Sequence, residues 1–466
     1  MVFASLEFLT LFLPAFLALY FATPRGWRNA TLLAGSWLFY AWWSPKFLLL
    51  IVALTLVAWA AAIAIESAPS ERTRTRLMAA AIAANVASLV WYKYTNVVVR
   101  SLNDVFSDGR APLIAWEPVL LPIALSFTVL HAISYVVDVR RGVVPAQRGL
   151  VAFSAYMAMF PHLIAGPIVR YRVIHRELVE RSFRVADFAE GARRFMLGFS
   201  MKVLVADPLA PLVALVFGQA APSLADAWIG CGAYALQLFF DFAGYSAMAI
   251  GLGLMLGFRF EENFNHPYLA ATIQDFWRRW HMTLSSWLRD YLYIPLGGNR
   301  LGEWRTYANL VATMAIGGMW HGGDSWNFLA WGLIHGAALA IARAWSGAGL
   351  AMPALAARAL TLLVVLLAWT VFRAEGFAAA VRMWQGQFGA HGIAMGDAVA
   401  LALRPVTWAA LGLGLACVLV PATPLARLAT GPRFAAWRAF WPFPVFGYAV
   451  AVLAGQKSIP FLYFQF

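Results

Sequence analysis

The chain has 466 residues, of which 62% are hydrophobic and only 12% are charged, about half of the ~25% that a soluble domain carries. This composition excludes an ordinary soluble protein and indicates one that lies mostly within a membrane. The net charge of +13 is typical of nucleic-acid-binding proteins, but here the basic residues lie between apolar segments, which excludes that class.

Apolar segments recur along the chain at lengths near the ~20 residues that a helix needs to cross a bilayer. We predict about eleven to thirteen membrane-embedded segments, with cores at 6–23, 28–42, 46–65, 77–98, 117–137, 149–165, 195–218, 226–256, 308–321, 326–344, 359–372, 406–422 and 440–455. Several are short or interrupted and are expected to be re-entrant or tilted. Without period-two alternation a barrel is excluded, so the expected fold is an all-α polytopic membrane protein.

No internal repeat or linker divides the sequence, so one membrane domain over 1–466 is predicted, with its motif core at 159–340. The first segment is not expected to be a cleaved signal peptide, because it carries Glu7 and no basic region precedes it. Cys231 and Cys417 lie in apolar runs and are expected to pack in the core.

Basic residues follow every second apolar segment near the N-terminus. Arginines stand at 25–28, 72–76 and 140–148, whereas the alternate connections are neutral or mixed and hold Lys46, Arg100, Asp104, Asp108, Arg110 and Glu117. Because basic loops stay in the cytoplasm, this pattern predicts an N-terminus outside and a location in the inner membrane.

The most charged interval is 170–194, RYRVIHRELVERSFRVADFAEGARR. Arg176 with Glu180 and Glu177 with Arg181 stand at i,i+4 spacing, which favours an exposed helix. Two interpretations remain open: a solvated cytoplasmic helix beside anionic lipid, or a positive mouth that attracts an anionic donor such as a coenzyme A.

The segment from Asp275 to Tyr291 has an amphipathic pattern at helical spacing. Its polar stripe consists of Arg278, His281, Ser285 and Arg289, and we expect this stripe to face a cavity. Arg289 is expected to pair with a carboxylate other than Asp290, because sequence neighbours point about 100° apart on a helix. Pro295, Gly297, Gly298 and Asn299 then form a turn.

His321 ends an apolar run and is followed by Gly322, Gly323 and Asp324. Glycines at this point permit a helix break, and ionisable groups at membrane depth usually serve function. A neutral imidazole can take a proton from a hydroxyl nucleophile at ordinary pH, so His321 is the candidate catalytic residue. His281 could orient it, share its channel, or only bridge neighbouring helices.

A metal site is not expected. On a continuous helix, His335 would lie about 21 Å from His321, so the two could not share an ion. The sequence also has no tight cluster of histidine, cysteine and carboxylate ligands.

Motifs along nearly the whole chain resemble the membrane-bound O-acyltransferase superfamily, in particular its bacterial alginate O-acetyltransferase branch. They are MVFASLEFLTLFLPAFLALYF at the start, LFYAWW, MFPHLIAGPIVRY, ALQLFFDFAGYSAMAIGLGLMLGFRFEENFNHPY, DFWRRWHMTLSSWLRDYLYIPLGGNR, MWHGG and PFLYFQF at the end. One departure from the expected DFSGYSD-like run is visible, at Ala243 and Ala247.

The resemblance implies a helix bundle around a central channel, with the family's catalytic histidine at His321 and its second polar position at His281. Candidates for lining that channel are Arg278, Arg289, Asp290, Asn299, Trp320 and Asp324. It further implies no bound cofactor, acetyl-coenzyme A or another acetyl thioester as donor, and a periplasmic SGNH-like acetyltransferase as partner.

The function expected from these features is acetyl transfer from a cytoplasmic donor toward a periplasmic acceptor, in support of O-acetylation of alginate, acetylated cellulose or a similar exopolysaccharide. Two alternatives remain open at this point. One is a lipid or polysaccharide transporter without chemistry, and the other is a D-alanyl or peptidoglycan-directed transferase of the same superfamily.

Overall fold

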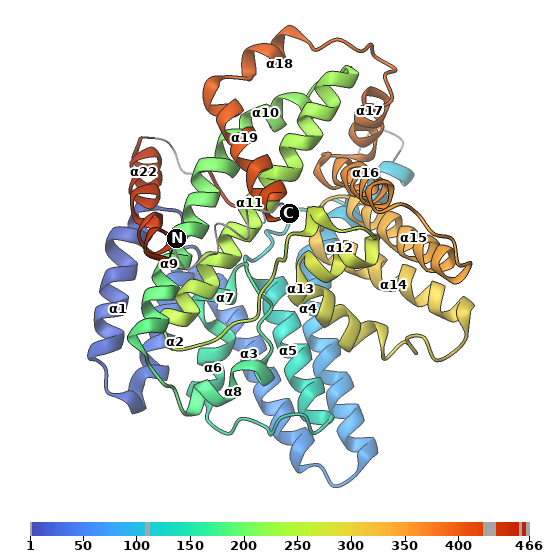
Figure 1. The fold of residues 1–466 in the computed structure, drawn as a ribbon. Coiled ribbons are helices and arrows are strands. Elements are labelled where there is room, and N and C mark those ends of the chain that lie inside the picture. The colour runs from blue at the N-terminus through green and yellow to red at the C-terminus, as the bar shows by residue number, and fades with distance from the viewer. Residues whose placement is uncertain (1, 108–111, 423–434, 456–458, 463–466) are drawn as a thin grey trace. The chain divides into compact units, whose positions relative to one another are not determined.

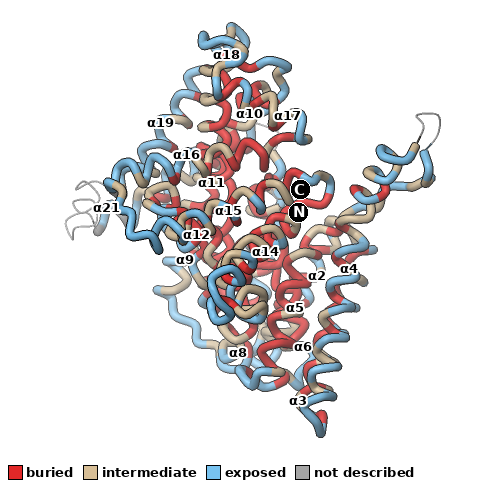
Figure 2. Tube along the Cα trace, turned by 90° about the vertical axis from the view of Figure 1, so that its right-hand side faces the viewer, coloured by how far each residue is buried: buried red, intermediate tan, exposed pale blue. Residues whose placement is uncertain are grey.

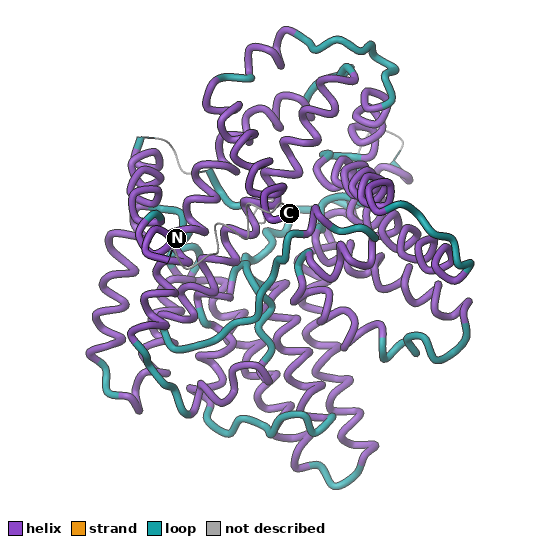
Figure 3. The backbone as a smooth tube through the Cα atoms, in the orientation of Figure 1, coloured by secondary structure: helices purple, strands orange, loops and turns teal. Residues whose placement is uncertain are grey.

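The computed structural model describes residues 2–107, 112–422, 435–455 and 459–462. Within these ranges every regular element is a helix and no strand occurs (Figure 3). The predicted all-α membrane fold is therefore confirmed. Asp108 and Arg110, which the topology argument used, lie outside the described residues.

The described residues form two compact units, and the chain alternates between them. The first unit consists of 1–195 and 246–261, and the second of 196–245 and 262–466. Helices α9 (Val185–Met201) and α11 (Leu224–Met255) contribute residues to both. Neither unit is continuous in sequence, and one membrane domain for the whole chain stays a prediction.

The first unit begins with closely connected helices (Figure 1, blue to green). Besides the start of α9 and the end of α11 it comprises η1 (Phe8–Phe12), α1 (Leu13–Ala22), η2 (Arg25–Trp27), α2 (Arg28–Ala41), α3 (Pro45–Ser67), α4 (Glu71–Phe106), α5 (Leu125–Arg140), α6 (Leu150–Ala158), α7 (Phe160–Leu163) and α8 (Tyr171–Val179). Helix α3 starts with Pro45 at its first position, and α4 is capped by the Ser70 hydroxyl, which accepts from Thr73 N at 3.1 Å.

Helix α5 forms the centre of the first unit. It packs against α3 and α4 and is buried along almost its whole length (Figure 2). The predicted segment 117–137 is helical only from Leu125. Residues 117–124 are not helical because Pro118 and Pro122 restrict the residues before them and remove backbone donors.

The second unit holds the remaining helices. Besides the ends of α9 and the start of α11 they are η3 (Lys202–Ala206), α10 (Asp207–Phe217), η4 (Pro267–Leu269), α12 (Ile273–Arg279), α13 (Met282–Leu288), η5 (Arg289–Tyr293), α14 (Glu303–His321), α15 (Asn327–Gly347), α16 (Ala354–Arg373), α17 (Phe377–Gln387), α18 (Asp397–Ala402), α19 (Pro405–Leu419), η6 (Val420–Ala422), α21 (Ala435–Phe440) and α22 (Pro442–Ala454). Helices α14 and α15 pair along their length, and α15 also contacts α12 and α16.

Five stretches of helix in the described residues are long and apolar enough to cross a membrane. They are Pro45–Ser67, Val185–Phe217, Leu224–Met255, Asn327–Gly347 and Ala354–Arg373. Phe8–Ala22, Pro405–Leu419 and Pro442–Ala454 are shorter apolar helices. Large apolar side chains such as Leu49 on α3 and Leu355 on α16 are exposed, as expected of surfaces that contact lipid. Cys417 is exposed on α19, so the prediction that it packs in the core is wrong, whereas Cys231 is buried.

The charged interval 170–194 is not one exposed helix. Helix α8 ends at Val179 and α9 begins at Val185. As a result Glu180 lies beyond the helix, and within the described part of the chain neither predicted i,i+4 ion pair forms. The prediction assumed that the helix continues, which the structure contradicts.

Arg181 is instead partly buried in the first unit. Its guanidinium donates hydrogen bonds to the Tyr20 hydroxyl and to Asn29 Oδ1, and it lies 4.2 Å from the centroid of the Phe258 ring. This arginine therefore joins the segment after α8 to helices that are distant in sequence.

Candidate active site

His321 is the last residue of α14 and is 6% exposed. The helix ends there because Gly322 takes an extended conformation, with φ −137° and ψ 149°. Just before the histidine, a Cβ on Gly318 would lie 2.2 Å from the carbonyl oxygen of Phe328. Only glycine allows α15 to approach this closely. The helix break predicted after His321 and the close contact between α14 and α15 together fix the position of the His321 imidazole.

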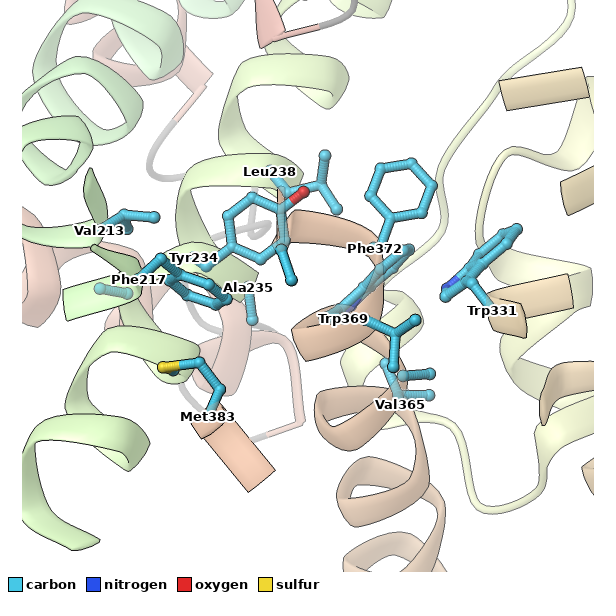
Figure 4. Packing of buried hydrophobic residues seen from close by; sticks show 14 of the residues in the cluster. Val213, Phe217, Tyr234, Ala235, Leu238, Trp331, Val365, Trp369, Phe372 and Met383 are labelled. Atoms are coloured by element: carbon cyan, nitrogen blue, oxygen red, sulfur yellow. The ribbon is translucent and has the colours of Figure 1, made fainter. Parts of the chain in front are cut away.

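Aromatic rings surround the imidazole of His321. Ring centroids lie 5.0 Å away for Trp320, 5.2 Å for Trp331 and 5.5 Å for Phe372. Trp331, Trp369 and Phe372 belong to the large apolar cluster of the second unit (Figure 4). Such walls exclude water and strengthen electrostatic interactions at the imidazole. Trp320, a predicted channel residue, thus contacts His321 directly.

His281 lies at a break between α12 and α13. Its backbone takes the left-handed conformation, with φ 44° and ψ 53°, so the predicted continuous amphipathic helix 275–291 is wrong. The break turns the His281 side chain away from the polar stripe and buries it completely. Its ring centroid is 6.3 Å from that of His321. The tertiary structure therefore brings together the two histidines that the sequence selects.

Asn263 orients the His281 ring. Its Oδ1 lies 3.0 Å from His281 Nδ1 and accepts from the backbone N–H and the hydroxyl of Thr283, at 3.3 and 2.9 Å. A backbone N–H can only donate, so the amide atom facing these groups is the oxygen. Nδ1 of His281 then carries the proton, and in the neutral ring Nε2 is an acceptor.

Nε2 of His281 is buried and has no hydrogen-bond partner within the described residues. His281 lies outside the five stretches of helix long enough to span a membrane, and burial lowers the pKa of its ring to about 3. The ring is therefore neutral at physiological pH, with a lone pair on Nε2 free for a donor that enters the site.

The sequence analysis missed Asn263. It stands in the FEENFNHPY motif, whose asparagines and glutamates offer no spacing that would distinguish one of them. Its partners are 18 and 20 residues away, so only the fold shows the contact.

The rest of the polar stripe lines a separate groove of about 480 Å³. Arg278, Ser285 and Arg289 form one wall, and Thr313 and Met314 of α14 lie across from them. His281 is not among the lining residues. The arginines thus face a cavity as predicted, but the broken helix separates them from the buried histidine.

The partner predicted for Arg289 is wrong. Its Nε donates to Asp290 Oδ1 at 2.8 Å, so the neighbouring carboxylate that the helical geometry excluded is the partner. Arg289 is 62% exposed, and its long side chain bends back to Asp290. Asn299 accepts from the Tyr293 hydroxyl in an exposed turn, and Asp324 is exposed as well.

His335 is a third buried histidine near this site. Its Nδ1 lies 3.3 Å from the indole nitrogen of Trp277, an obligate donor, so Nδ1 is the acceptor. The Trp331 ring contacts both His335 and His321, with centroids 4.8 and 5.2 Å away. The continuous helix assumed for the spacing of these two histidines is interrupted between α14 and α15. In the described residues no group of three or more potential ligands could hold a metal ion.

Known proteins match most of the chain. The membrane-bound O-acyltransferase family model matches residues 144–373, which include both His281 and His321. The probable alginate O-acetylase of Azotobacter vinelandii is 47% identical over 392 residues, covering 83% of this chain and 78% of the relative. The probable alginate O-acetylase of Pseudomonas aeruginosa is 46% identical over 393 residues, covering 83% of this chain and 75% of the relative. The peptidoglycan O-acetyltransferase of Helicobacter pylori is 34% identical over 404 residues, covering 80% and 75%.

The family model covers four of the seven motifs from which the sequence analysis predicted the superfamily, from MFPHLIAGPIVRY to MWHGG. With the identity to the probable alginate O-acetylases, that prediction is confirmed. The chain belongs to the membrane-bound O-acyltransferase family and is a membrane acyltransferase.

Proposed function

We propose that this protein is an O-acetyltransferase that moves acetyl groups from a cytoplasmic thioester toward a periplasmic acceptor, in support of exopolysaccharide O-acetylation. The observation that carries the proposal is the buried pair of His321 and His281, whose rings lie 6.3 Å apart. The pair occurs in a chain that is 46–47% identical to probable alginate O-acetylases over 83% of its length.

His321 acts as the general base in this proposal. Its imidazole takes the proton of the acceptor hydroxyl while the hydroxyl oxygen attacks the thioester carbonyl carbon. The C–O bond forms, the C–S bond breaks, and the imidazolium returns the proton to the leaving thiolate. The products are an acetyl ester and a free thiol, and His321 is regenerated.

Nε2 of His281 accepts a hydrogen bond from a second donor group of the acceptor and so holds the attacking hydroxyl beside His321. Asn263 keeps the ring in the tautomer that this contact requires. This division of roles follows a common arrangement in enzymes, in which a third group orients the catalytic pair.

The donor in this proposal is acetyl-coenzyme A or another acetyl thioester. Its phosphates would be attracted to the basic connections of the cytoplasmic side, with a strength that falls as salt rises. An SGNH-like acetyltransferase in the periplasm would complete transfer to the polysaccharide. The arginine distribution supports an N-terminus outside, and the similarity to bacterial O-acetylases supports a location in the inner membrane.

Helix α4 offers a test of this topology. It runs from the arginines at 72–76 to Asp104, and its 36 residues reach about 54 Å at 1.5 Å per residue, more than the ~30 Å hydrocarbon core. Single cysteines at Arg72 and Arg184 should resist an impermeant thiol reagent in intact cells, and one at Asp104 should react. Arg184 suits this labelling because its side chain is 62% exposed, whereas the nearby Arg181 donates to Tyr20 and Asn29.

The labelling is measured in a chain whose exposed Cys417 is replaced by Ala. Reaction of the cysteines at 72 and 184 from outside would invert the topology and remove the cytoplasmic donor from the proposal. Permeabilised cells, in which all three positions should react, provide the control for reactivity.

The proposed function itself is tested by mass analysis of the exopolysaccharide and the peptidoglycan from cells with and without the gene. We expect acetyl esters to disappear from the exopolysaccharide and to return when the gene is restored. Loss of acetyl groups from peptidoglycan alone would support the role named for the Helicobacter pylori relative and contradict the exopolysaccharide proposal.

A further inference from the structure

A buried ion cluster lies where η3 packs against α11 in the second unit. The ammonium of Lys202 donates to Asp207 Oδ1 and lies 3.4 Å from Asp241 Oδ1. Lys202 and Asp241 are only 1% and 2% exposed. The lysine begins a π-helical turn, a rare feature that is frequent at functional sites. None of these residues takes part in the acetyl transfer proposed above.

The end of the described chain completes the cluster. The backbone carbonyl of Ile459 accepts a hydrogen bond from Lys202 Nζ at 3.0 Å, and the backbone N–H of Leu462 donates to Asp241 Oδ2 at 2.9 Å. The Phe461 ring packs edge-on against Tyr245, with centroids 4.3 Å apart. All three donors of the ammonium thereby face an oxygen.

The anchored carboxylate stands next to a residue that contacts the candidate active site. Phe242 follows Asp241 on α11, and its fully buried ring packs edge-on against His281, with centroids 4.7 Å apart and an interplanar angle of 87°. Contacts hold Asp241 on both carboxylate oxygens. These two contacts fix the rotation of this turn of α11 about the helix axis. They thereby also fix the direction of the Phe242 side chain, which points about 100° away from that of Asp241.

We propose that Lys202 and Asp241, closed by the backbone of 459–462, are positioning residues for acetyl transfer. They hold Phe242 against His281 and so keep this imidazole in place beside His321. This inference rests on the proposed function. It gives a role to one cation and two carboxylates in an apolar interior, where replacement of such a group by apolar residues is often neutral or stabilising.

A double-mutant cycle between the cluster and the aromatic contact tests this coupling. Asp241→Asn places an amide N–H₂ group beside the Lys202 ammonium or the Leu462 N–H, and Phe242→Ala removes the wall behind His281. Each change should lower kcat of the membrane-embedded full-length protein about tenfold, with KM for the acetyl donor nearly unchanged, and the double variant should be about as active as Phe242→Ala alone.

A pH profile separates positioning from a merely structural role. His321 is the titratable group whose ring lies against His281. In both single variants water should reach His281 and bring its pKa up toward the ordinary ~6.5. Activity would then fall at a higher pH on the acid side than in the native protein. Phe240→Ala is the matched control, because Phe240 flanks Asp241 on the other side and packs in a different cluster.

The proposal would be overturned if the loss of kcat in the double variant equalled the product of the two single losses. It would also be overturned if kcat fell in the single variants while the acid side of the pH profile stayed where it is in the native protein. If Asp241→Asn fails to accumulate in the membrane, Phe242→Leu, which conserves most of the apolar volume, carries the pH measurement alone. Failure of the proposed function would be distinguished from failure of this inference, because it would be seen as full activity of the His321→Ala variant.

Discussion

His321→Ala is expected to abolish acetylation of the polymer while the protein remains in the membrane at its normal level. General acid–base contributions are about 10²–10⁴-fold, and the rings of Trp320, Trp331 and Phe372 that surround the imidazole cannot take up a proton in its place. The helix should survive, since His321 is its final residue and alanine favours helix. Acetyl release from the purified exopolysaccharide, compared at equal protein level, measures the effect.

His391→Ala is the matched control for this experiment. His391 is a partly buried histidine of the same unit whose Nδ1 faces the carbonyl of Pro222, and it has no part in the proposed chemistry. Its loss should leave acetylation close to normal. Near-normal acetylation in the His321→Ala strain would instead remove His321 from the mechanism.

His281→Asn is expected to lower acetyl transfer by about ten- to a hundredfold, the range that one or two lost hydrogen bonds in a buried site correspond to. Asparagine tolerates the left-handed backbone that His281 adopts, so the break between α12 and α13 is retained while Nε2 is lost. Initial rates in membrane preparations, with the amount of protein determined in parallel, give the comparison.

The same substitution at His266 is the control, because His266 also has a positive φ, of 47°, but is exposed. His266→Asn should be almost fully active. Equal losses in the two variants would show that the backbone and not the imidazole matters at position 281. Asn263→Leu should reproduce the defect of His281→Asn, because it leaves the Nδ1 proton without its acceptor.

Other expectations from the sequence failed at points where local geometry changes. The amphipathic pattern from Asp275 to Tyr291 assigns side chains to faces on the assumption of one continuous helix. The helix is broken at His281, so the pattern placed this side chain on the wrong face. The positive φ of His281 is imposed by packing against Asn263 and Phe242, and both contacts are distant in sequence. Contacts distant in sequence also explain why the expected Glu177–Arg181 ion pair does not form, because Arg181 donates to Tyr20 and Asn29, about 150 residues away.

The sequence by itself determined that this protein is an all-helical membrane protein of the O-acyltransferase family and that His321 and His281 are its outstanding polar residues. Apolar runs, arginine distribution and motifs are local properties of the sequence and do not depend on how the helices pack. Only the tertiary structure decided which residues accompany the two histidines: Asn263 on the His281 ring, and Lys202 and Asp241 behind Phe242. Such contacts join segments far apart in the chain and depend on the direction of each side chain after packing, which no local pattern specifies.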